Sequence, residues 1–294
     1  MASDLFKADA PFRQLVRRAS QRAGVDLEKI CLRGPARELT RTKYLQPLLV
    51  CVSLGYLRRL VDIGVTPETI LGHSLGEISA LAAAGIVSFE IAVDIAAKRG
   101  ELMDAAAARA PGAMAALITA ERDTVLHLLA QKFPGAQLVL ANDNAPNQIV
   151  VSGEVAALQQ FALLVAAEKL GRCRRLAVAG PWHSPLMARA QREFSSWLDT
   201  IEFRAPQVPL IFNVTAAPEN DPQKIRQLIA RNLVEPVRWR AAMATLRGAR
   251  ELSLFEVGPG RVLSSLARAN GFGNDTSICQ VNNQRGIEMA ARLG

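Results

Sequence analysis

One short stretch constrains the fold of this chain more than any other. The sequence Gly72-His-Ser-Leu-Gly76 follows a short apolar run and precedes a segment rich in alanine and leucine. Glycines two positions to either side of a serine suit a sharp turn from a strand into a helix, where larger side chains would collide with the backbone. We therefore predict a strand over 69–71, a helix over 77–84, and Ser74 as an exposed nucleophile at the start of that helix. A tight packing turn is the alternative.

The composition is that of a soluble globular chain. Of the 294 residues, 50% are hydrophobic and 21% are charged, which is enough for one large domain with a smaller one inserted. The most apolar window, 78–97, contains Glu90 and Asp94, so it is typical of a buried helix and not of a membrane span. The first residues carry Asp4 and no apolar run, which argues against a signal peptide. We expect a cytoplasmic protein without a membrane segment.

The cysteines and charges narrow the possible ligands. The four cysteines, at positions 31, 51, 173 and 279, show no Cys-x-x-Cys spacing, so we predict neither a metal site nor a disulfide framework. A net charge of +8 favours an acidic partner. The densest basic cluster, Arg172, Arg174 and Arg175, has no interleaved aromatic residues, and nucleic-acid binding is therefore not expected.

Strand and helix patterns alternate along most of the chain, which predicts an α/β fold. Up to about residue 61 the pattern is helical, and Pro47 suits the first turn of a helix over 48–60. Residues 113–178 carry the β-α-β-β-α-β order of a ferredoxin-like subdomain. We expect it to be inserted into a larger, α/β-hydrolase-like domain formed by 1–112 and 179–294. In that domain we predict further strands at 209–214, 252–256 and 277–281, and helices at 88–108, 185–200, 222–233, 238–247 and 260–269.

A serine nucleophile needs a base, and the chain has only three histidines. His73 adjoins the serine and points elsewhere on the turn, while His127 lies in an amphipathic helix of the predicted subdomain. His183 stands in a polar break, Ala179-Gly-Pro-Trp-His-Ser-Pro-Leu-Met187, where a side chain can face a cleft. We therefore favour His183 as the base, against the alternative of a structural histidine near a helix start.

Several motifs now carry a resemblance to a known family. They are Gly72-His-Ser-Leu-Gly-Glu77, Lys98-Arg-Gly-Glu-Leu-Met103, Asn142-Asp-Asn144 with Gln148-Ile-Val-Val-Ser-Gly153, His183-Ser-Pro-Leu-Met187, Pro236-Val-Arg-Trp239 and Glu256-Val-Gly-Pro-Gly260. In this order, over nearly the whole chain, they resemble the malonyl-CoA:acyl carrier protein transacylase family, including polyketide synthase acyltransferase domains.

The resemblance implies a two-step acyl transfer in fatty acid or polyketide synthesis. Ser74 attacks the thioester of malonyl-CoA while His183 accepts its proton, and the phosphopantetheine thiol of an acyl carrier protein then takes the malonyl group. The family orients its histidine by a backbone carbonyl, which corresponds here to Asn232, and takes one oxyanion donor from the residue after the nucleophile, here Leu75. No cofactor and no metal are implied, because the CoA thioester is a substrate.

The resemblance also implies an acyl pocket. Arg99 matches the family arginine that grips the free carboxylate of the malonyl group, which suits a planar guanidinium able to donate two parallel hydrogen bonds. Met103, one helical turn later, is expected to line the same pocket. Trp182 occupies a position where the family carries residues that shape the pocket, and its large ring favours plain malonyl over branched groups.

The sequence departs from the family at its start. Family members begin with a strand and a Gly-Gln-Gly loop that gives the second oxyanion donor, and no Gly-Gln-Gly occurs here. We expect either a natural protein with a longer N-terminus or a shortened relative with impaired transfer. Loss of one oxyanion donor costs on the order of 10²–10³ in rate, and loss of a strand exposes a sheet edge.

Three alternatives stay open at this point. The same scaffold suits the malonyl-transfer subunit of a malonate decarboxylase or an acyl hydrolase, although Arg99 disfavours the hydrolase. The third alternative is a non-catalytic protein that binds the carrier protein without serine acylation.

Overall fold

The turn around Ser74 lies between a short strand and a helix. In a computed structural model, which describes residues 1–248 and 251–293, Ser74 stands between β1 (Ile70–Leu71) and α6 (Gly76–Ala83). Its backbone has φ of 52°, in the left-handed region that few residues other than glycine adopt. The predicted strand, turn and helix are confirmed.

The chain begins with five helices, as the periodicity predicts. They are α1 (Ser3–Ala8), α2 (Ala10–Ala23), α3 (Leu27–Arg33), α4 (Ala36–Leu39) and α5 (Thr42–Asp62). The prediction that Pro47 lies in the first turn of a helix over 48–60 is wrong, because α5 starts at Thr42 and Pro47 lies inside it. A proline there has no N–H to donate to the carbonyl of Lys43, so the first turns depend on packing against neighbouring helices.

The strands of the large domain are shorter than predicted and form two separate pairs. β1 pairs in parallel with β6 (Leu210–Ile211), which covers only two residues of the predicted strand 209–214. β7 (Ser253–Val257) pairs in parallel with β8 (Ser277–Val281). No strand joins the two pairs among the residues that the structure describes. The expected continuous alternation is thus interrupted in the middle of the domain.

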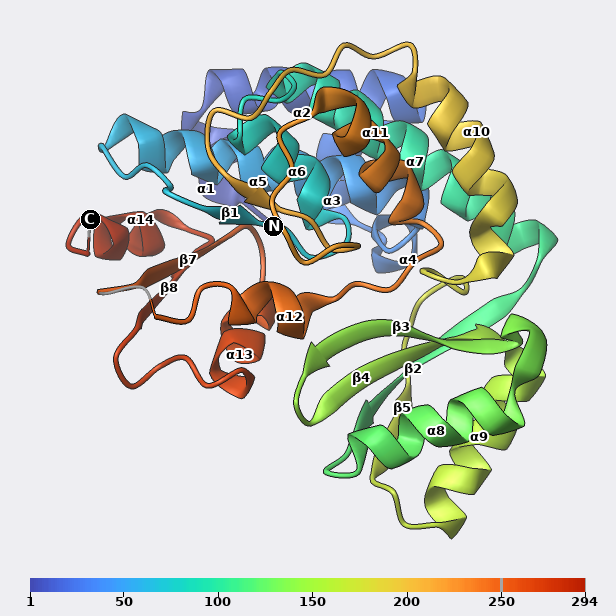
Figure 1. Ribbon diagram of the computed structural model, residues 1–294. Helices are drawn as coiled ribbons and strands as arrows, with labels where there is room; N and C mark the ends of the chain where they lie inside the picture. Colours follow the sequence, from blue (N-terminus) through green and yellow to red (C-terminus); the bar gives the residue numbers. More distant parts are fainter. Residues whose placement is uncertain (249–250, 294) are drawn as a thin grey trace.

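Helices surround these strands (Figure 1). Ser88 caps α7 (Phe89–Arg109) as its sequence suggests, since its hydroxyl accepts a hydrogen bond from the Ile91 N–H at 3.3 Å. The predicted helix over 185–200 begins as a single 3₁₀ turn, Pro185–Met187. The remaining helices are α7 (Phe89–Arg109), α10 (Ala188–Leu198), α11 (Pro222–Arg231), α12 (Trp239–Ala244), α13 (Val262–Ala269) and α14 (Gln284–Ala290).

A four-stranded antiparallel sheet forms the smaller unit, drawn in green at the lower right of Figure 1. Its elements are β2 (Gly112–Ile118), α8 (Arg122–Lys132), a 3₁₀ turn (Pro134–Ala136), β3 (Leu138–Ala145), β4 (Gln148–Glu154), α9 (Val155–Ala167) and β5 (Arg172–Arg175). The strand order β3-β4-β2-β5 is that of a ferredoxin-like fold. The α/β class with such an insertion therefore describes the chain.

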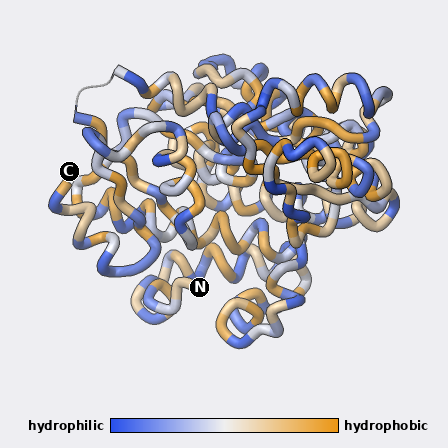
Figure 2. The backbone as a smooth tube through the Cα atoms, turned by 90° about the horizontal axis from the view of Figure 1, so that it is seen from below, coloured by the Kyte–Doolittle hydropathy of each residue, from blue (hydrophilic) through white to orange (hydrophobic). Residues whose placement is uncertain are grey.

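Three apolar clusters hold the molecule together. The largest unites the N-terminal helices with α6, α7 and α10, a second fills the small unit between its sheet and its two helices, and a third joins α12 and α13. Seen from below in Figure 2, hydrophobic and hydrophilic stretches alternate along the helices, as expected for helices with one buried face. None of the described helices combines the length and apolarity that crossing a membrane requires.

The end of β3 connects the small unit to the large one. The Asp143 N–H donates to the Val237 carbonyl at 2.9 Å, and its carboxylate accepts from Arg122 and from Arg240, at 2.8 and 3.0 Å. One residue further, the Asn144 side chain contacts His73 Nε2 at 2.8 Å. The small sheet is therefore fixed directly to the turn that carries Ser74.

The two glycines of the turn differ in what surrounds them, and this generates a prediction. A Cβ at Gly72 would overlap the backbone of Gly76 and Glu77, whereas a Cβ at Gly76 would meet nothing within 4 Å. Gly72→Ala should lower the free energy of unfolding by about 1–3 kcal/mol, since backbone cannot move aside easily. Gly76→Ala, at the start of a helix, should change it by less than about 1 kcal/mol. Urea denaturation of both variants checks this, and equal losses would contradict it.

Candidate active site

The structure brings Ser74 and His183 together across 109 residues of sequence. Ser74 Oγ lies 2.7 Å from His183 Nε2, a hydrogen-bonding distance. Ser74 comes from the turn before α6, and His183 from the segment just before the 3₁₀ turn that leads into α10. His183 also has a left-handed backbone, with φ of 57°. Such backbone strain at both members of a pair is typical of functional sites.

The surroundings of His183 fix its tautomer. Its Nδ1 lies 2.6 Å from the backbone carbonyl of Asn232, which can only accept a hydrogen bond. The proton must therefore sit on Nδ1, which leaves the Nε2 lone pair facing the Ser74 hydroxyl. Burial, together with the nearby Arg99 charge, lowers the pKa of His183 to about 3. The imidazole is thus neutral at physiological pH and able to accept a proton.

Arg99 lies beside this pair, deep in the protein. Its side chain comes from α7 and is 2% exposed. Nη1 donates to Gln46 Oε1 at 2.9 Å, and Nη2 donates to Asn232 Oδ1 at 3.1 Å and to Ser74 Oγ at 3.2 Å. All three acceptors are neutral. Burial lowers the pKa of Arg99 to about 10, so the guanidinium is still charged at pH 7.

A buried carboxylate, Glu77, organises these residues from behind. Its two oxygens accept from the Asn213 N–H and from Asn232 Nδ2, the latter at 2.7 Å. Asn213 in turn accepts from the Ser74 N–H at 2.7 Å and donates to the Gly72 carbonyl. Burial raises the pKa of Glu77 to about 8, against the effect of the Asn213 N–H and of the Arg99 charge. One side chain therefore positions both the serine turn and the carbonyl that orients His183.

The N–H of Leu75 is placed differently from its neighbours. The N–H groups of Ser74, Gly76 and Glu77 each donate to an acceptor in the protein, whereas that of Leu75 has none among the described residues. A free backbone N–H next to a nucleophile can stabilise the charge that develops on a carbonyl oxygen. This placement fits the oxyanion role suggested for Leu75, which stays a prediction.

Met103, Trp182 and His127, which the sequence analysis also considered, lie in different surroundings. Met103 Sδ lies 3.1 Å from Gln46 Nε2, so it joins the arginine cluster through Gln46. Trp182 is buried, and a Cβ at Gly180 would come within 2.6 Å of its ring; the effect of Trp182 on acyl size stays a prediction. His127 is exposed on α8, as expected from its helix face.

Sequence reasoning missed three residues of this network: Gln46, Glu77 and Asn213. Glu77 ends the motif Gly72-His-Ser-Leu-Gly-Glu77, but the sequence alone indicates no role for it. Gln46 interrupts the largely apolar run 44–52, and Asn213 interrupts the apolar run 208–214. Both are 5% exposed or less. A polar residue within an apolar run is the one signal that could have indicated them.

A left-handed serine at a strand-to-helix turn, paired with a neutral histidine and backed by a buried arginine, defines the class of serine acyl-transfer proteins built on an α/β fold. The family model described as acyl transferase domain matches residues 1–277. The chain belongs to this acyl transferase family, and within it to the malonyl-CoA:acyl carrier protein transacylases. The resemblance drawn from the motifs is confirmed.

Individual relatives are similar to this chain over most of their lengths. A malonyl CoA-acyl carrier protein transacylase of Bacillus subtilis is 34% identical over 269 residues, which are 91% of this chain and 85% of the relative. The crystal structure of an acyl carrier protein S-malonyltransferase from Vibrio cholerae is 33% identical, with a TM-score of 0.90, over 98% of this chain and 94% of the other. A malonyl-transacylase solved in complex with a type II polyketide synthase acyl-carrier protein is 32% identical, with a TM-score of 0.92, over 100% and 95%.

The position of Glu77 predicts how its replacement affects the serine. In Glu77→Gln, an amide nitrogen faces one of the two donors, so either the Asn213 or the Asn232 contact is lost. Loss of a buried hydrogen bond of this kind costs about 1–3 kcal/mol, and we expect Ser74 of the variant to react roughly 5–150-fold more slowly with a fluorophosphonate probe than native Ser74 does above pH 8, where native Glu77 is ionised. In the native protein this rate should rise as the pH increases through about 8, because Glu77 then ionises and accepts from both donors.

The pH dependence of the Ser74 reaction rate distinguishes a positioning role of Glu77 from a general loss of stability. In Glu77→Gln the rise near pH 8 should be absent. Glu256→Gln is the matched control, since Glu256 also accepts two backbone N–H groups, from Leu263 and Ser264 at 2.9 and 2.8 Å, at the start of α13. It should leave the profile intact. A rise that persists in Glu77→Gln would show that Glu77 does not set it.

The low pKa of His183 predicts a pH dependence of stability. Between pH 6.5 and about 3 the unfolded chain binds a proton on this histidine and the folded chain does not. The free energy of unfolding should therefore fall as the pH drops through this range, by up to about 1.4 kcal/mol per pH unit. His183→Gln should reduce that slope, and His127→Gln, at an exposed position, should not. Urea denaturation at pH 5 and pH 7 measures both, and unchanged slopes in both variants would refute the assignment.

Proposed function

We propose that this chain transfers a malonyl group from malonyl-CoA, through an ester on Ser74, to the phosphopantetheine thiol of an acyl carrier protein in fatty acid or polyketide synthesis. The observation that carries this proposal is the buried Arg99, whose guanidinium lies 3.2 Å from the Ser74 hydroxyl and is held only by neutral acceptors. A carboxylate on the acyl group would supply the anion that this cation lacks. The names of the curated relatives support the same substrate.

In the first half of the reaction, His183 Nε2 takes the proton as Ser74 Oγ attacks the thioester carbonyl. The Leu75 N–H donates to the oxyanion of the tetrahedral intermediate. When the carbon–sulfur bond breaks, the CoA thiolate leaves and takes up the proton held on His183. The Asn232 carbonyl accepts from Nδ1–H throughout, so the imidazolium forms without turning.

In the second half, the phosphopantetheine thiol gives its proton to His183 and attacks the malonyl ester. The carbon–oxygen bond to Ser74 breaks, and His183 returns the proton to Oγ. The net charge of +8 favours encounter with an acidic carrier protein. The structure of a related malonyl-transacylase in complex with an acyl-carrier protein supports this partner.

We also propose that the protein works in the cytoplasm. All four of its cysteines are free, and three of them are buried. Free thiols without disulfides are typical of a reducing compartment. No group of three or more His, Cys, Asp or Glu side chains in the described part of the chain is placed to hold a metal ion.

Intact-mass spectrometry tests the proposal. After brief incubation with malonyl-CoA, the protein should gain one malonyl group, which peptide mapping should place on Ser74. Addition of a holo acyl carrier protein should remove it and load the carrier. Ser74→Ala should gain nothing. Label on another residue, or release to water at the same rate with and without the carrier, would refute the transfer mechanism.

The same assay examines the acyl-group selectivity. Arg99→Lys keeps the positive charge but cannot donate two parallel hydrogen bonds to a carboxylate. We expect the ratio of malonyl to acetyl loading to fall by at least about ten-fold in this variant, since one charge-assisted hydrogen bond, worth about 1.5–3 kcal/mol, is lost. Arg109→Lys, at an exposed site on the same helix, is the matched control. An unchanged ratio in Arg99→Lys would remove Arg99 from substrate selection.

A further inference from the structure

A buried asparagine, Asn270, ends α13 at the point where this helix meets the small unit. Its side chain is 3% exposed. The amide nitrogen donates to the backbone carbonyl of Leu266 in its own helix and to that of Asn144 in β3, both at 2.8 Å. Because a carbonyl oxygen can only accept, both amide protons of Asn270 are used and the side chain has one orientation.

The β3 carbonyl that Asn270 binds belongs to a bulge. The register between β3 and β4 shifts by one residue between Asp143 and Ala145, which leaves Asn144 as an extra residue in β3. A bulge takes its extra residue out of the ladder and turns the side chain in a new direction. Since Asn144 is buried, its carbonyl needs a donor from elsewhere, and Asn270 supplies it.

The same bulge directs the Asn144 side chain at the serine turn. Its Oδ1 lies 2.8 Å from Nε2 of His73, the residue before Ser74. Its amide nitrogen donates to Gln148 Oε1 at 3.1 Å, so both ends of the side chain are held. The hydrogen bonds therefore run in one series from α13, through Asn270 and Asn144, to His73. Polar side chains connected in this way restrain one another.

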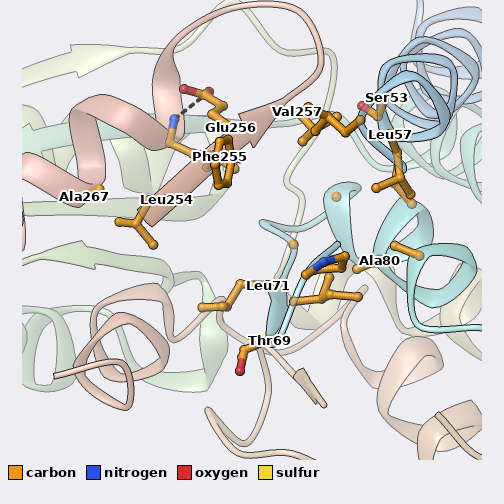
Figure 3. A pocket seen from close by; sticks show the side chains of 18 of the residues that line it. Ser53, Leu57, Thr69, Leu71, Ala80, Leu254, Phe255, Glu256, Val257 and Ala267 are labelled. Carbon is orange, nitrogen blue, oxygen red and sulfur yellow. Dashed lines mark hydrogen bonds between the residues drawn. The ribbon is translucent and has the colours of Figure 1, made fainter. Parts of the chain in front are cut away.

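α13 is a firm base for this series because apolar packing fixes it. Leu266 and Ala267, in its last turn, are buried and pack with Leu254 of β7 in one apolar cluster. Figure 3 shows Ala267 beside Leu254. The helical turn that carries Asn270 therefore cannot shift without losing this packing.

We propose that Asn270 is a positioning residue for the reactive serine. By holding the carbonyl of Asn144, it directs the side chain of that residue at His73 and so fixes the turn that carries Ser74. Glu77 restrains the same turn from within the large domain, whereas Asn270 acts through the small unit. The proposal rests on the part of the proposed function that makes Ser74 the nucleophile, and it is independent of which acyl group is transferred.

A purely structural role of Asn270 has different consequences. An asparagine that only stabilises the end of α13 affects the free energy of unfolding and leaves the reactivity of Ser74 in the folded protein unchanged. If Asn270 acts through His73, its replacement slows Ser74 only while His73 is present. The dependence of one replacement on the other therefore distinguishes the two roles.

The experiment measures the rate at which Ser74 reacts with a fluorophosphonate probe. In Asn270→Leu the side chain keeps a similar size but donates no hydrogen bond. We expect the rate to fall by at least about five-fold, the equivalent of one ordinary hydrogen bond. Asn282→Leu is the matched control, since Asn282 Nδ2 also donates to a backbone carbonyl, that of Gly260, at 3.2 Å. It should change the rate by less than about two-fold, as expected for a site near the surface.

Two further measurements distinguish the roles. In a His73→Phe background, which keeps an aromatic ring beside Trp239, Asn270→Leu should no longer slow the reaction. The nitrogen chemical shifts of the His73 ring should change in Asn270→Leu and stay the same in Asn282→Leu. Asn270→Ala repeats both measurements if the leucine variant folds poorly, because it leaves room for a water molecule to replace the amide.

The native protein gives a test that needs no variant. The side-chain amide protons of Asn270 should exchange slowly with solvent, because both are donated to buried carbonyls. Fast exchange would overturn the proposal, as would equal slowing by Asn270→Leu with and without His73, or an unchanged Ser74 rate in a folded variant. If native Ser74 does not react with the probe at all, the proposed function fails instead, and the His73 chemical shifts still test the role of Asn270.

Discussion

The geometry of the site depends on one buried carboxylate, that of Glu77. Its two oxygens hold the Asn213 backbone and the Asn232 side chain. Through these asparagines they fix the Ser74 N–H and the carbonyl that accepts the hydrogen bond from His183 Nδ1–H. Burial raises the pKa of Glu77 to about 8, so its carboxyl group is largely protonated at pH 7, while the Asn213 N–H and the Arg99 charge favour the ionised form. The shape of the site therefore depends on the protonation state of this one carboxyl group.

This arrangement explains how two strained residues persist side by side. Ser74 and His183 both have left-handed backbones, which cost of order 1–3 kcal/mol each. The hydrogen bonds from the Ser74 N–H to Asn213 and from His183 to Asn232 fix these conformations from two different elements. Because both asparagines bind Glu77, the strain is opposed by one connected network.

The local structure of the site could be predicted from the sequence, whereas most contacts between distant segments could not. The turn around Ser74 could be predicted because glycines near a serine restrict the backbone locally, and His183 because only three histidines compete. Asn213 and Gln46 could not, since their importance arises only when distant segments meet. The predicted start of α5 near Pro47 is wrong. Packing against neighbouring helices outweighs the loss of the one hydrogen bond that a proline cannot donate.

In the proposed mechanism, the buried Arg99 would also couple substrate binding to the strength of the base. Burial is the main cause of the low pKa of His183, and the positive charge of Arg99 lowers it further. A carboxylate bound to the guanidinium would cancel that charge and allow the pKa of His183 to rise toward its ordinary value, so that the histidine accepts the serine proton more readily. An acyl group without a carboxylate would leave the base weak. In the proposed mechanism, selectivity would therefore arise at the proton transfer as well as in the binding of the acyl group.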